Sequence, residues 1–144
     1  MVKFPMNFEV EAKAPSGISS QWIAQANHLP PIPSAIPPEF TGPGGGYSPE
    51  DLFGIAVLNC LIALYKVYCE KSKLVFQEIK AKAVLTADKD PASVSFYISH
   101  IDVFLTVEGA SDQEKARKLL ESAIKDCPIS NSIKSAKSFH ISFV

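Results

Sequence analysis

Hydrophobic and polar residues alternate at the start of the chain. Phe8, Val10 and Ala12 share one face and charged residues occupy the positions between them, which is the period of a half-buried strand. A turn signal at residues 14–17 separates this strand from a second alternating stretch over residues 18–24. The pattern predicts a β-hairpin at the beginning of the chain.

The next segment is dominated by proline. Residues 30–43 hold six prolines, and three glycines follow at residues 44–46. Proline has no backbone N–H, so such a run predicts neither a helix nor a central strand. We interpret residues 30–46 as an extended connecting segment. The pattern leaves open whether it is a plain linker or lies against another surface.

The longest apolar segment predicts a helix over residues 49–71. Ser48 suits the N-cap and Pro49 the first helical position. Glu50 and Asp51 then complement the positive end of the helix dipole. Because the helix is apolar on nearly every face, it must be buried in a protein core or in a membrane.

A membrane span is the weaker of these two interpretations. The apolar run over residues 52–65 is shorter than the roughly 20 residues that a spanning helix needs. Gly54 and Asn59 also interrupt it. We therefore expect a helix buried in protein and no membrane as a partner.

Two long strands follow, over residues 75–87 and 94–107, with a turn signal at residues 89–91. In the second strand the apolar residues change from even to odd positions near Ser99-His100. A period-2 pattern that changes phase predicts a β-bulge at that point.

A second helix and a last strand complete the pattern. Ser111 and Glu114 fit a capping box, and the apolar stripe of the helix ends on Cys127, in its last turn, before Pro128 stops it. Residues 139–143 alternate as a final strand. Hairpins dominate this order of elements, so we expect an α+β fold with mainly antiparallel sheets, forming a single domain over residues 1–144.

Composition and charge narrow the classes of partner. The chain is 47% hydrophobic and 20% charged with a net charge of −1, and it has no basic block, which argues against nucleic acid. Residues 1–15 lack the apolar core of a secretory signal. Three cysteines are an odd number, so a cytoplasmic protein with free thiols is expected.

Two of these cysteines are candidates for redox chemistry. Cys60 and Cys127 each fall on the apolar face of a predicted helix. If they meet, one thiol can become a sulfenic acid and the other can condense with it to a disulfide. The alternative is that both are small core residues. Cys69 lies nine residues from Cys60, about half a turn away around the helix, so we expect it to be structural.

Metal chemistry is not indicated by the spacing of ligands. His28, His100 and His140 are scattered, and no pair of cysteines or histidines has the spacing of a metal site. We expect no metal.

Several motifs together resemble a known family. They are Pro-Pro-Glu-Phe-Thr-Gly at residues 37–42, Tyr-Ser-Pro-Glu-Asp-Leu-Phe at residues 47–53, Cys60, and Cys-Pro-Ile-Ser at residues 127–130. In this order and spacing they resemble the OsmC/Ohr family over essentially the whole chain. The resemblance implies an intertwined α+β homodimer, with the two central helices buried and the active sites at the subunit interface.

The resemblance also implies an activity. It makes Cys60 the peroxidatic cysteine and Cys127 the resolving one, with Glu50 contributing to the site. The implied reaction is the reduction of organic or fatty-acid hydroperoxides to alcohols, in oxidative-stress defence. A dithiol such as a lipoyl group would re-reduce the disulfide, and no metal, flavin or haem cofactor is implied.

The chain departs from the family at one point. Hydroperoxide reductases of the family place an arginine beside the reactive cysteine, whereas the single arginine here, Arg117, lies ten residues or about 15 Å before Cys127. Lys13 is the candidate substitute cation, without the planar fork of arginine. The alternative function is therefore a non-catalytic or redox-sensing protein that binds an apolar small molecule.

Glu50 is subject to a geometric limit. It lies ten residues before Cys60, again about 15 Å along a straight helix, so the two side chains cannot meet within that helix. Either Glu50 serves a site through the partner subunit or a distorted helix start, or it only stabilises the helix dipole.

Overall fold

The computed structural model describes residues 2–144. The chain divides into two compact units, Met1–Leu52 and Phe53–Val144, and each unit is described by itself. Helix α1 (Pro49–Lys71) belongs to both. The single domain expected over residues 1–144 therefore stays a prediction.

The first unit holds a three-stranded antiparallel sheet. Strands β1 (Val10–Lys13), β2 (Trp22–Ala26) and β3 (Ile32–Ser34) lie in the order β1-β2-β3, so the predicted hairpin is confirmed. The second strand begins later than expected. Hydrogen bonds from the N–H and hydroxyl of Ser20 to the carbonyls of Gly17 and Ser16 keep the preceding residues in a turn.

The proline-rich segment has more structure than expected. Pro33 lies in β3, at an edge of the sheet, where a missing N–H donor is tolerated. A single turn of 3₁₀ helix, η1 (Pro38–Phe40), then interrupts the extended path. The expectation of an extended segment is wrong for this turn, because proline also suits the first position of a helix.

Helix α1 has the limits that the sequence predicted. The Asp51 N–H donates to Ser48 Oγ at 3.0 Å, and the Ser48 N–H donates to Asp51 Oδ2 at 2.9 Å. Two backbone donors at the helix start are thus satisfied reciprocally. The predicted cap at Ser48 is confirmed.

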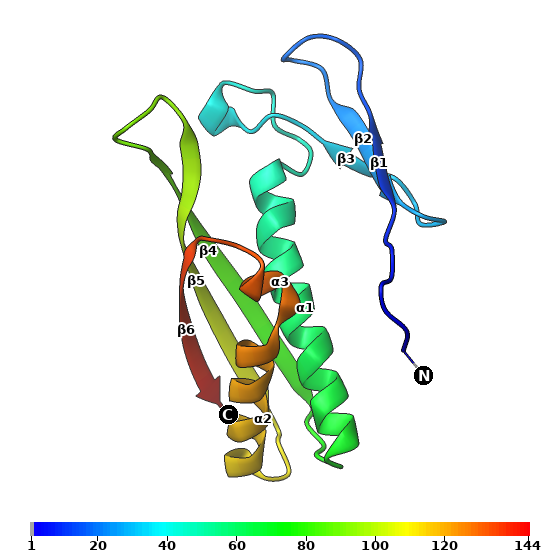
Figure 1. Ribbon diagram of the computed structural model, residues 1–144, viewed down its shortest axis with the longest axis vertical. Helices are drawn as coiled ribbons and strands as arrows, with labels where there is room; N and C mark the ends of the chain where they lie inside the picture. The colour runs from blue at the N-terminus through cyan, green and yellow to red at the C-terminus, as the bar shows by residue number, and fades with distance from the viewer. Residues whose placement is uncertain (1) are drawn as a thin grey trace. The chain divides into compact units, whose positions relative to one another are not determined.

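The second unit pairs a mixed sheet with helices, as Figure 1 shows. Strands β4 (Glu78–Lys89) and β5 (Phe96–Glu108) are antiparallel, and β6 (Ala136–Phe143) is parallel to β5. Helices α2 (Gln113–Asp126) and α3 (Pro128–Asn131) form the crossover from β5 to β6. Helices α1 and α2 lie on the same face of the sheet and share one core with it. The α+β class is confirmed.

The bulge lies where the change of phase predicted it. Thr86 pairs with His100 and Ala87 pairs with Ile98, which leaves Ser99 as the extra residue. After the bulge, the odd-numbered residues of β5 face the helices and are fully buried. They are Ile101, Val103, Leu105 and Val107.

Helix α1 approaches the sheet closely at one glycine. A Cβ atom on Gly54 would lie 2.7 Å from Leu85 Cδ1 of β4, closer than carbon atoms approach each other. Val57, Leu61 and Tyr65 continue the same face of the helix and are fully buried. Gly54 therefore lets α1 lie against β4.

The second helix differs from its prediction at both ends. Asp112 is the N-cap in place of Ser111, because its Oδ1 accepts from the Lys115 N–H at 3.0 Å. Ser111 Oγ instead accepts from the Val75 N–H. At the other end, Cys127 is the C-cap rather than part of the last turn, and the one-turn helix α3 after it was not predicted.

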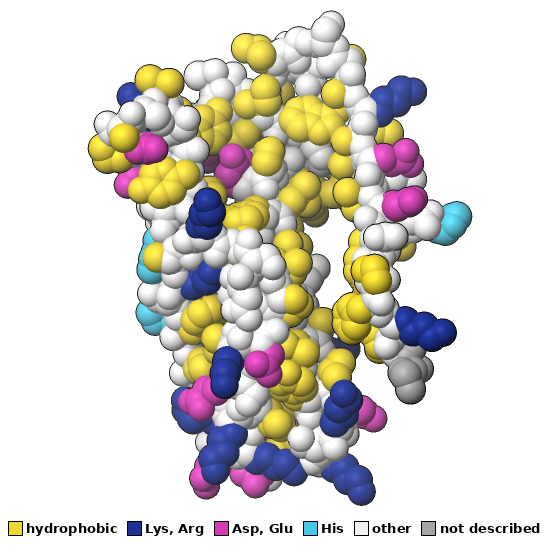
Figure 2. All heavy atoms as spheres, in the orientation of Figure 1, with side chains coloured by type: hydrophobic (Ala, Val, Ile, Leu, Met, Phe, Trp, Pro, Cys, Tyr) yellow, Lys and Arg dark blue, Asp and Glu magenta, His cyan; other side chains and the backbone are white. Residues whose placement is uncertain are grey.

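Much of the apolar surface of α1 is open in a single chain. By length and composition it is the one helix in residues 2–144 that matches a membrane span, a match that core helices also give, and 28% of its apolar 18-residue window is buried. Exposed Ile55 and Val67 lie on its outer side, and hydrophobic side chains remain visible along it in Figure 2. The predicted burial is thus met on one face only.

Candidate thiol site

Cys127 sits at the junction of α2 and α3 and is fully buried. The junction exists because Pro128 cannot continue α2 but suits the first position of a new helix. Cys127 is the N-cap of that helix, and its sulfur accepts from the Ser130 N–H at 3.4 Å. The local sequence therefore fixes the position of this thiol.

Cys60 lies midway along α1, beside the buried stripe of the helix. Its side chain is half-buried and packs against the hydrophobic core. It also lies close enough to the Cys127 thiol to contribute to the rise in the pKa of that thiol. The structure thus brings together two cysteines that lie far apart in the sequence.

Burial sets the protonation state of the inner thiol. The pKa of Cys127 is raised to about 11, first by burial and then by the neighbouring Cys60 thiol, while the N–H groups of Ser130 and Ile129 oppose the shift. Cys127 is therefore a neutral thiol near pH 7. Cys60 is the member of the pair that a molecule from solvent reaches first, because it is the less buried one.

Cys69 has a different neighbour. It is buried near the C-terminal end of α1, and burial raises the pKa of its thiol, while the neighbouring Tyr65 hydroxyl opposes that shift. The Tyr65 hydroxyl is itself buried, and its pKa is raised by burial and by Cys69. Cys69 thus belongs to a tyrosine contact and not to the Cys60–Cys127 pair. A purely structural role for it stays a prediction.

The two cations considered from the sequence lie in different units. The Arg117 guanidinium stacks over the Phe143 ring, 4.9 Å from its centroid, in agreement with its exclusion from sequence spacing. Lys13 is exposed at the end of β1, in the first unit. Its role as a substitute cation stays a prediction.

Sequence reasoning missed Lys137. Its Nζ is part-buried and donates to the carbonyl oxygens of Ser130 at 2.8 Å and Ile133 at 3.2 Å. The signal was present in the sequence. Lys137 shares the odd positions of β6 with Phe139 and Ile141, which pack on the core.

Glu50 lies in the first turn of α1, in the first unit. Its side chain is half-buried, and its Oε2 atom is buried with no hydrogen-bond partner among residues 2–144. A buried carboxylate oxygen without a partner is costly. The Glu50 Oε2 atom is therefore an acceptor at the start of α1 that still lacks a donor. The contribution of Glu50 to a site stays a prediction.

Comparison with known families decides the identity of the fold. The model of the OsmC family, described as OsmC-like protein, matches residues 42–142, which is more than half of the chain. The chain belongs to the OsmC-like family.

Solved structures agree with this assignment. An OsmC-like protein of unknown function from Vibrio cholerae superimposes on the chain with a TM-score of 0.80 at 14% identity, over 95% of this chain and 99% of that one. An organic hydroperoxide resistance protein from Elizabethkingia anophelis, with thiocyanate bound, gives 0.75 at 17% identity, over 99% and 98%. An organic hydroperoxide resistance protein, OsmC, from Legionella pneumophila gives 0.69 at 22% identity, over 96% and 98%.

At these identities the structural likeness establishes the fold. No functionally curated protein matches the chain at a significant level. The activity of this OsmC-like protein therefore has to be argued from its own thiols.

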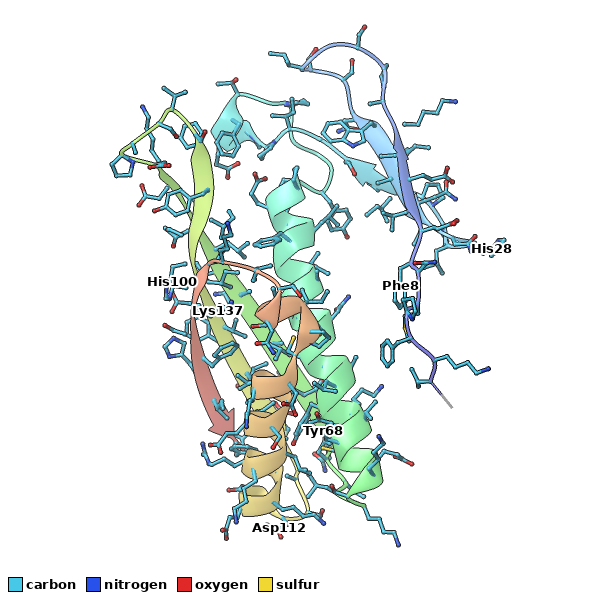
Figure 3. All side chains as sticks on the ribbon, in the orientation of Figure 1. Phe8, His28, Tyr68, His100, Asp112 and Lys137 are labelled. Atoms are coloured by element: carbon cyan, nitrogen blue, oxygen red, sulfur yellow. The ribbon has the colours of Figure 1, made fainter. Side chains whose placement is uncertain are left out.

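This OsmC-like chain also carries a polar cluster that the sequence did not reveal. The sequence predicts scattered histidines, yet the Nε2 atoms of His100 and His140 lie 3.5 and 3.1 Å from Asp102 Oδ1 on the outer face of the sheet, where Figure 3 labels His100. The hydrogen bond with His140 holds the pKa of Asp102 below its usual range. The parallel pairing of β5 and β6 assembles this cluster.

The cluster is not a catalytic triad or a metal centre. Ser138 Oγ contacts the same Nε2 atom of His100 that faces Asp102, whereas a triad uses the two ring nitrogens for different partners. Among residues 2–144, no group of three or more His, Cys, Asp or Glu side chains is arranged to hold a metal ion.

Proposed function

We propose that this protein is a thiol-dependent peroxidase that reduces organic or fatty-acid hydroperoxides to alcohols. Its proposed catalytic residues are Cys60 and Cys127, with Glu50 in support. It works in the cytoplasm in oxidative-stress defence, without a metal, flavin or haem cofactor. An external dithiol such as a lipoyl group restores the reduced enzyme.

The contact between Cys60 and Cys127 carries the proposal. The two thiols differ in the way that a two-cysteine cycle requires, because Cys60 is partly open and Cys127 is fully buried. A hydroperoxide can reach the half-buried Cys60 thiol, whereas the buried Cys127 thiol is accessible only to Cys60. The apolar residues around the pair favour a substrate with an apolar tail.

The cycle balances in three steps. The Cys60 thiolate attacks the hydroperoxide, the O–O bond breaks, and the alkoxide leaves as the alcohol while Cys60 becomes a sulfenic acid. The Cys127 thiol loses its proton and attacks the Cys60 sulfur, so that an S–S bond forms, the S–O bond breaks and water leaves. A dithiol then reduces the disulfide by two exchanges and is itself oxidised to a disulfide.

The proposed enzyme is a homodimer. Support comes from α1, since 28% of its apolar window is buried in one chain and a water-soluble protein has to cover the remainder. A second copy, with the same face, is the simplest cover. The unpartnered Glu50 Oε2 atom and the exposed Lys13 are then the groups that the assembled dimer has available to complete its sites.

A second candidate function follows from the position of Arg117. Its guanidinium is engaged with Phe143, so it is not available to stabilise a thiolate at Cys60. A chain with the thiol pair but without that cation suits a redox sensor or a carrier of an apolar small molecule, which forms the disulfide once and turns over poorly.

The deciding experiment measures the consumption of cumene hydroperoxide and of a fatty-acid hydroperoxide, with dihydrolipoamide as the reductant. We expect turnover by the wild type and by Cys69→Ser, a matched loss of one helix thiol outside the pair. Cys60→Ser should abolish it. Cys127→Ser should form a sulfenic acid that dimedone traps and should turn over more slowly than the wild type, because dihydrolipoamide then has to reduce the sulfenic acid itself.

The outcomes separate the two functions. Wild-type activity no greater than that of Cys60→Ser contradicts the peroxidase. A stoichiometric Cys60–Cys127 disulfide without turnover supports the sensor. Sedimentation of the wild type as a monomer at micromolar concentration contradicts the dimer.

A further inference from the structure

Lys137 occupies an unusual place for a lysine. It is the second residue of β6, on the side of the strand that packs on the core with Phe139 and Ile141, and Figure 3 labels it where β6 passes α3. Its amine is part-buried and bonds two backbone carbonyls. A lysine amine is rarely buried unless it has specific hydrogen-bond partners.

Those carbonyls belong to the turn that follows Cys127. The last carbonyls of a helix have no partners within the helix, and α3 is a single turn. Lys137 Nζ donates to Ser130 O at 2.8 Å and to Ile133 O at 3.2 Å, at the end of this turn. Lysine side chains satisfy such helix ends well.

Ser130 connects the lysine to the thiol. Its carbonyl accepts from Lys137, and its N–H donates to the Cys127 sulfur at 3.4 Å. Two other side-chain bonds hold the same turn, from Ser132 Oγ to Pro128 O and from Asn131 Nδ2 to Lys125 O. Both stay within α2, α3 and the residue after them, whereas the Lys137 bonds attach the turn to the sheet.

We infer that Lys137 is a positioning residue for the resolving cysteine, holding the α3 turn so that the Cys127 sulfur faces Cys60. The inference rests on the proposed function, because it concerns the second step of that cycle. In that step Cys127 loses its proton and attacks the Cys60 sulfenic sulfur. The S–S bond forms as the S–O bond breaks, and water leaves.

The electrostatics of the turn agree with this role. The N–H groups of Ser130 and Ile129 oppose the rise in the pKa of Cys127 that burial causes. If the turn loosens, those donors move away and the thiolate becomes harder to form. The loss of Lys137 should therefore slow disulfide formation and shift its pH dependence upward.

The test compares three variants in a Cys69→Ser background. Lys137→Met removes the amine and keeps an apolar stem, and Lys137→Arg keeps donors and charge. Lys134→Met is the matched control, since Lys134 is an exposed lysine in the same loop. Each protein receives one equivalent of cumene hydroperoxide between pH 6 and 9, and quenched samples are analysed by mass spectrometry for trapped sulfenic acid and for disulfide.

We expect Lys137→Met to form the sulfenic acid at the wild-type rate and the disulfide about tenfold more slowly, less than the roughly hundredfold that a 1 Å misplacement of reacting groups can cost. The difference should narrow as the pH rises. Lys137→Arg should recover most of the rate, and Lys134→Met should match the wild type. An unchanged rate in Lys137→Met, or an equal loss in Lys134→Met, overturns the inference.

A peroxide-independent arm separates this inference from the proposed function. Diamide oxidises two thiols to a disulfide while its N=N bond is reduced to a hydrazine, and its second step is the same attack by Cys127. If the wild type ignores hydroperoxide, the peroxidase fails, but the order of the variants with diamide still decides the role of Lys137. If Lys137→Met does not fold, Lys137→Gln carries the same expectation of slower closure.

Discussion

The two faces of strand β5 carry very different chemistry. On the inner face, Leu105 and its odd-numbered neighbours are fully buried beside the helices that hold the two cysteines. On the partly solvent-exposed outer face, Asp102 contacts His100 and His140, and Phe104 stacks on His140. Adjacent residues of one strand thus experience opposite environments.

The comparison shows what burial does to an ionisable group. Inside, burial is the largest cause of the shift and raises the pKa of Cys127. Outside, a hydrogen bond with His140 dominates and lowers the pKa of Asp102. The inner face favours a neutral thiol, and the outer face favours a solvated charge network that contributes little to stability.

The largest contrast should appear when each face loses one large side chain. Leu105→Ala should lower the free energy of unfolding by about 2–5 kcal/mol, because it leaves a cavity in a close-packed core. Phe104→Ala should cost about 1 kcal/mol, because that ring is 42% exposed and mainly stacks on His140. Urea unfolding at one fixed protein concentration measures both, and equal losses would contradict the assignment of the faces.

An intermediate effect should appear at high pH on the inner face. Since the pKa of Cys127 is raised to about 11, its stabilising contribution is complete below the unfolded value near 9 and is lost as the pH rises towards 11. The loss amounts to about 2 kcal/mol. Unfolding of the reduced wild type and of Cys127→Ala between pH 8 and 11 measures it.

The wild type should lose more stability than the variant over that interval. Cys69 and Tyr65 also have raised pKa values, but both proteins share them, so their contributions cancel in the comparison. Parallel curves for the two proteins would show that Cys127 is not held as a neutral thiol.

The smallest effect should come from the outer face at low pH. The pKa of Asp102 is lowered by His140 and His100, so its contribution is present above the unfolded value near 4 and is lost as the pH falls below it. Asp102→Asn should therefore be slightly less stable than the wild type at pH 7, and the difference should be smaller at pH 3. Thermal unfolding at both pH values tests this. If the wild type and Asp102→Asn differ in stability by the same amount at pH 7 and pH 3, the Asp102 carboxylate is not the source of the difference.

Local pattern was sufficient for most of the secondary structure. Ser48, Pro49 and the apolar run after them predicted the limits of α1, because caps and periodicity act over a few residues. The change of phase in β5 predicted the bulge at Ser99 for the same reason. The prediction was wrong at Ser111 because its hydroxyl accepts a hydrogen bond from the distant Val75 N–H, and Asp112 caps the helix in its place.

Some residues of the candidate site could likewise be predicted from the sequence, and others only from the structure. Family motifs indicated Cys60 and Cys127 as a pair, and the structure adds their contact and the depth of each thiol. The pairing of His100 with His140 through Asp102 depends on β6 lying parallel to β5. His140 is 38 residues from Asp102, so the pattern of either strand alone does not predict this contact. The Lys137 bonds span only seven and four residues, but they form only where the chain turns back from α3 into β6.

The sequence by itself determined the helices, the strands, the fold class and the two cysteines, because hydrophobic period, caps and motif spacing are properties of neighbouring residues. Only the tertiary structure decided which of the two cysteines is less buried, which lysine bonds the α3 turn, and which ring the single arginine stacks on. Those outcomes depend on burial and on how the turn, the sheet and the helices pack together, which no run of neighbouring residues specifies.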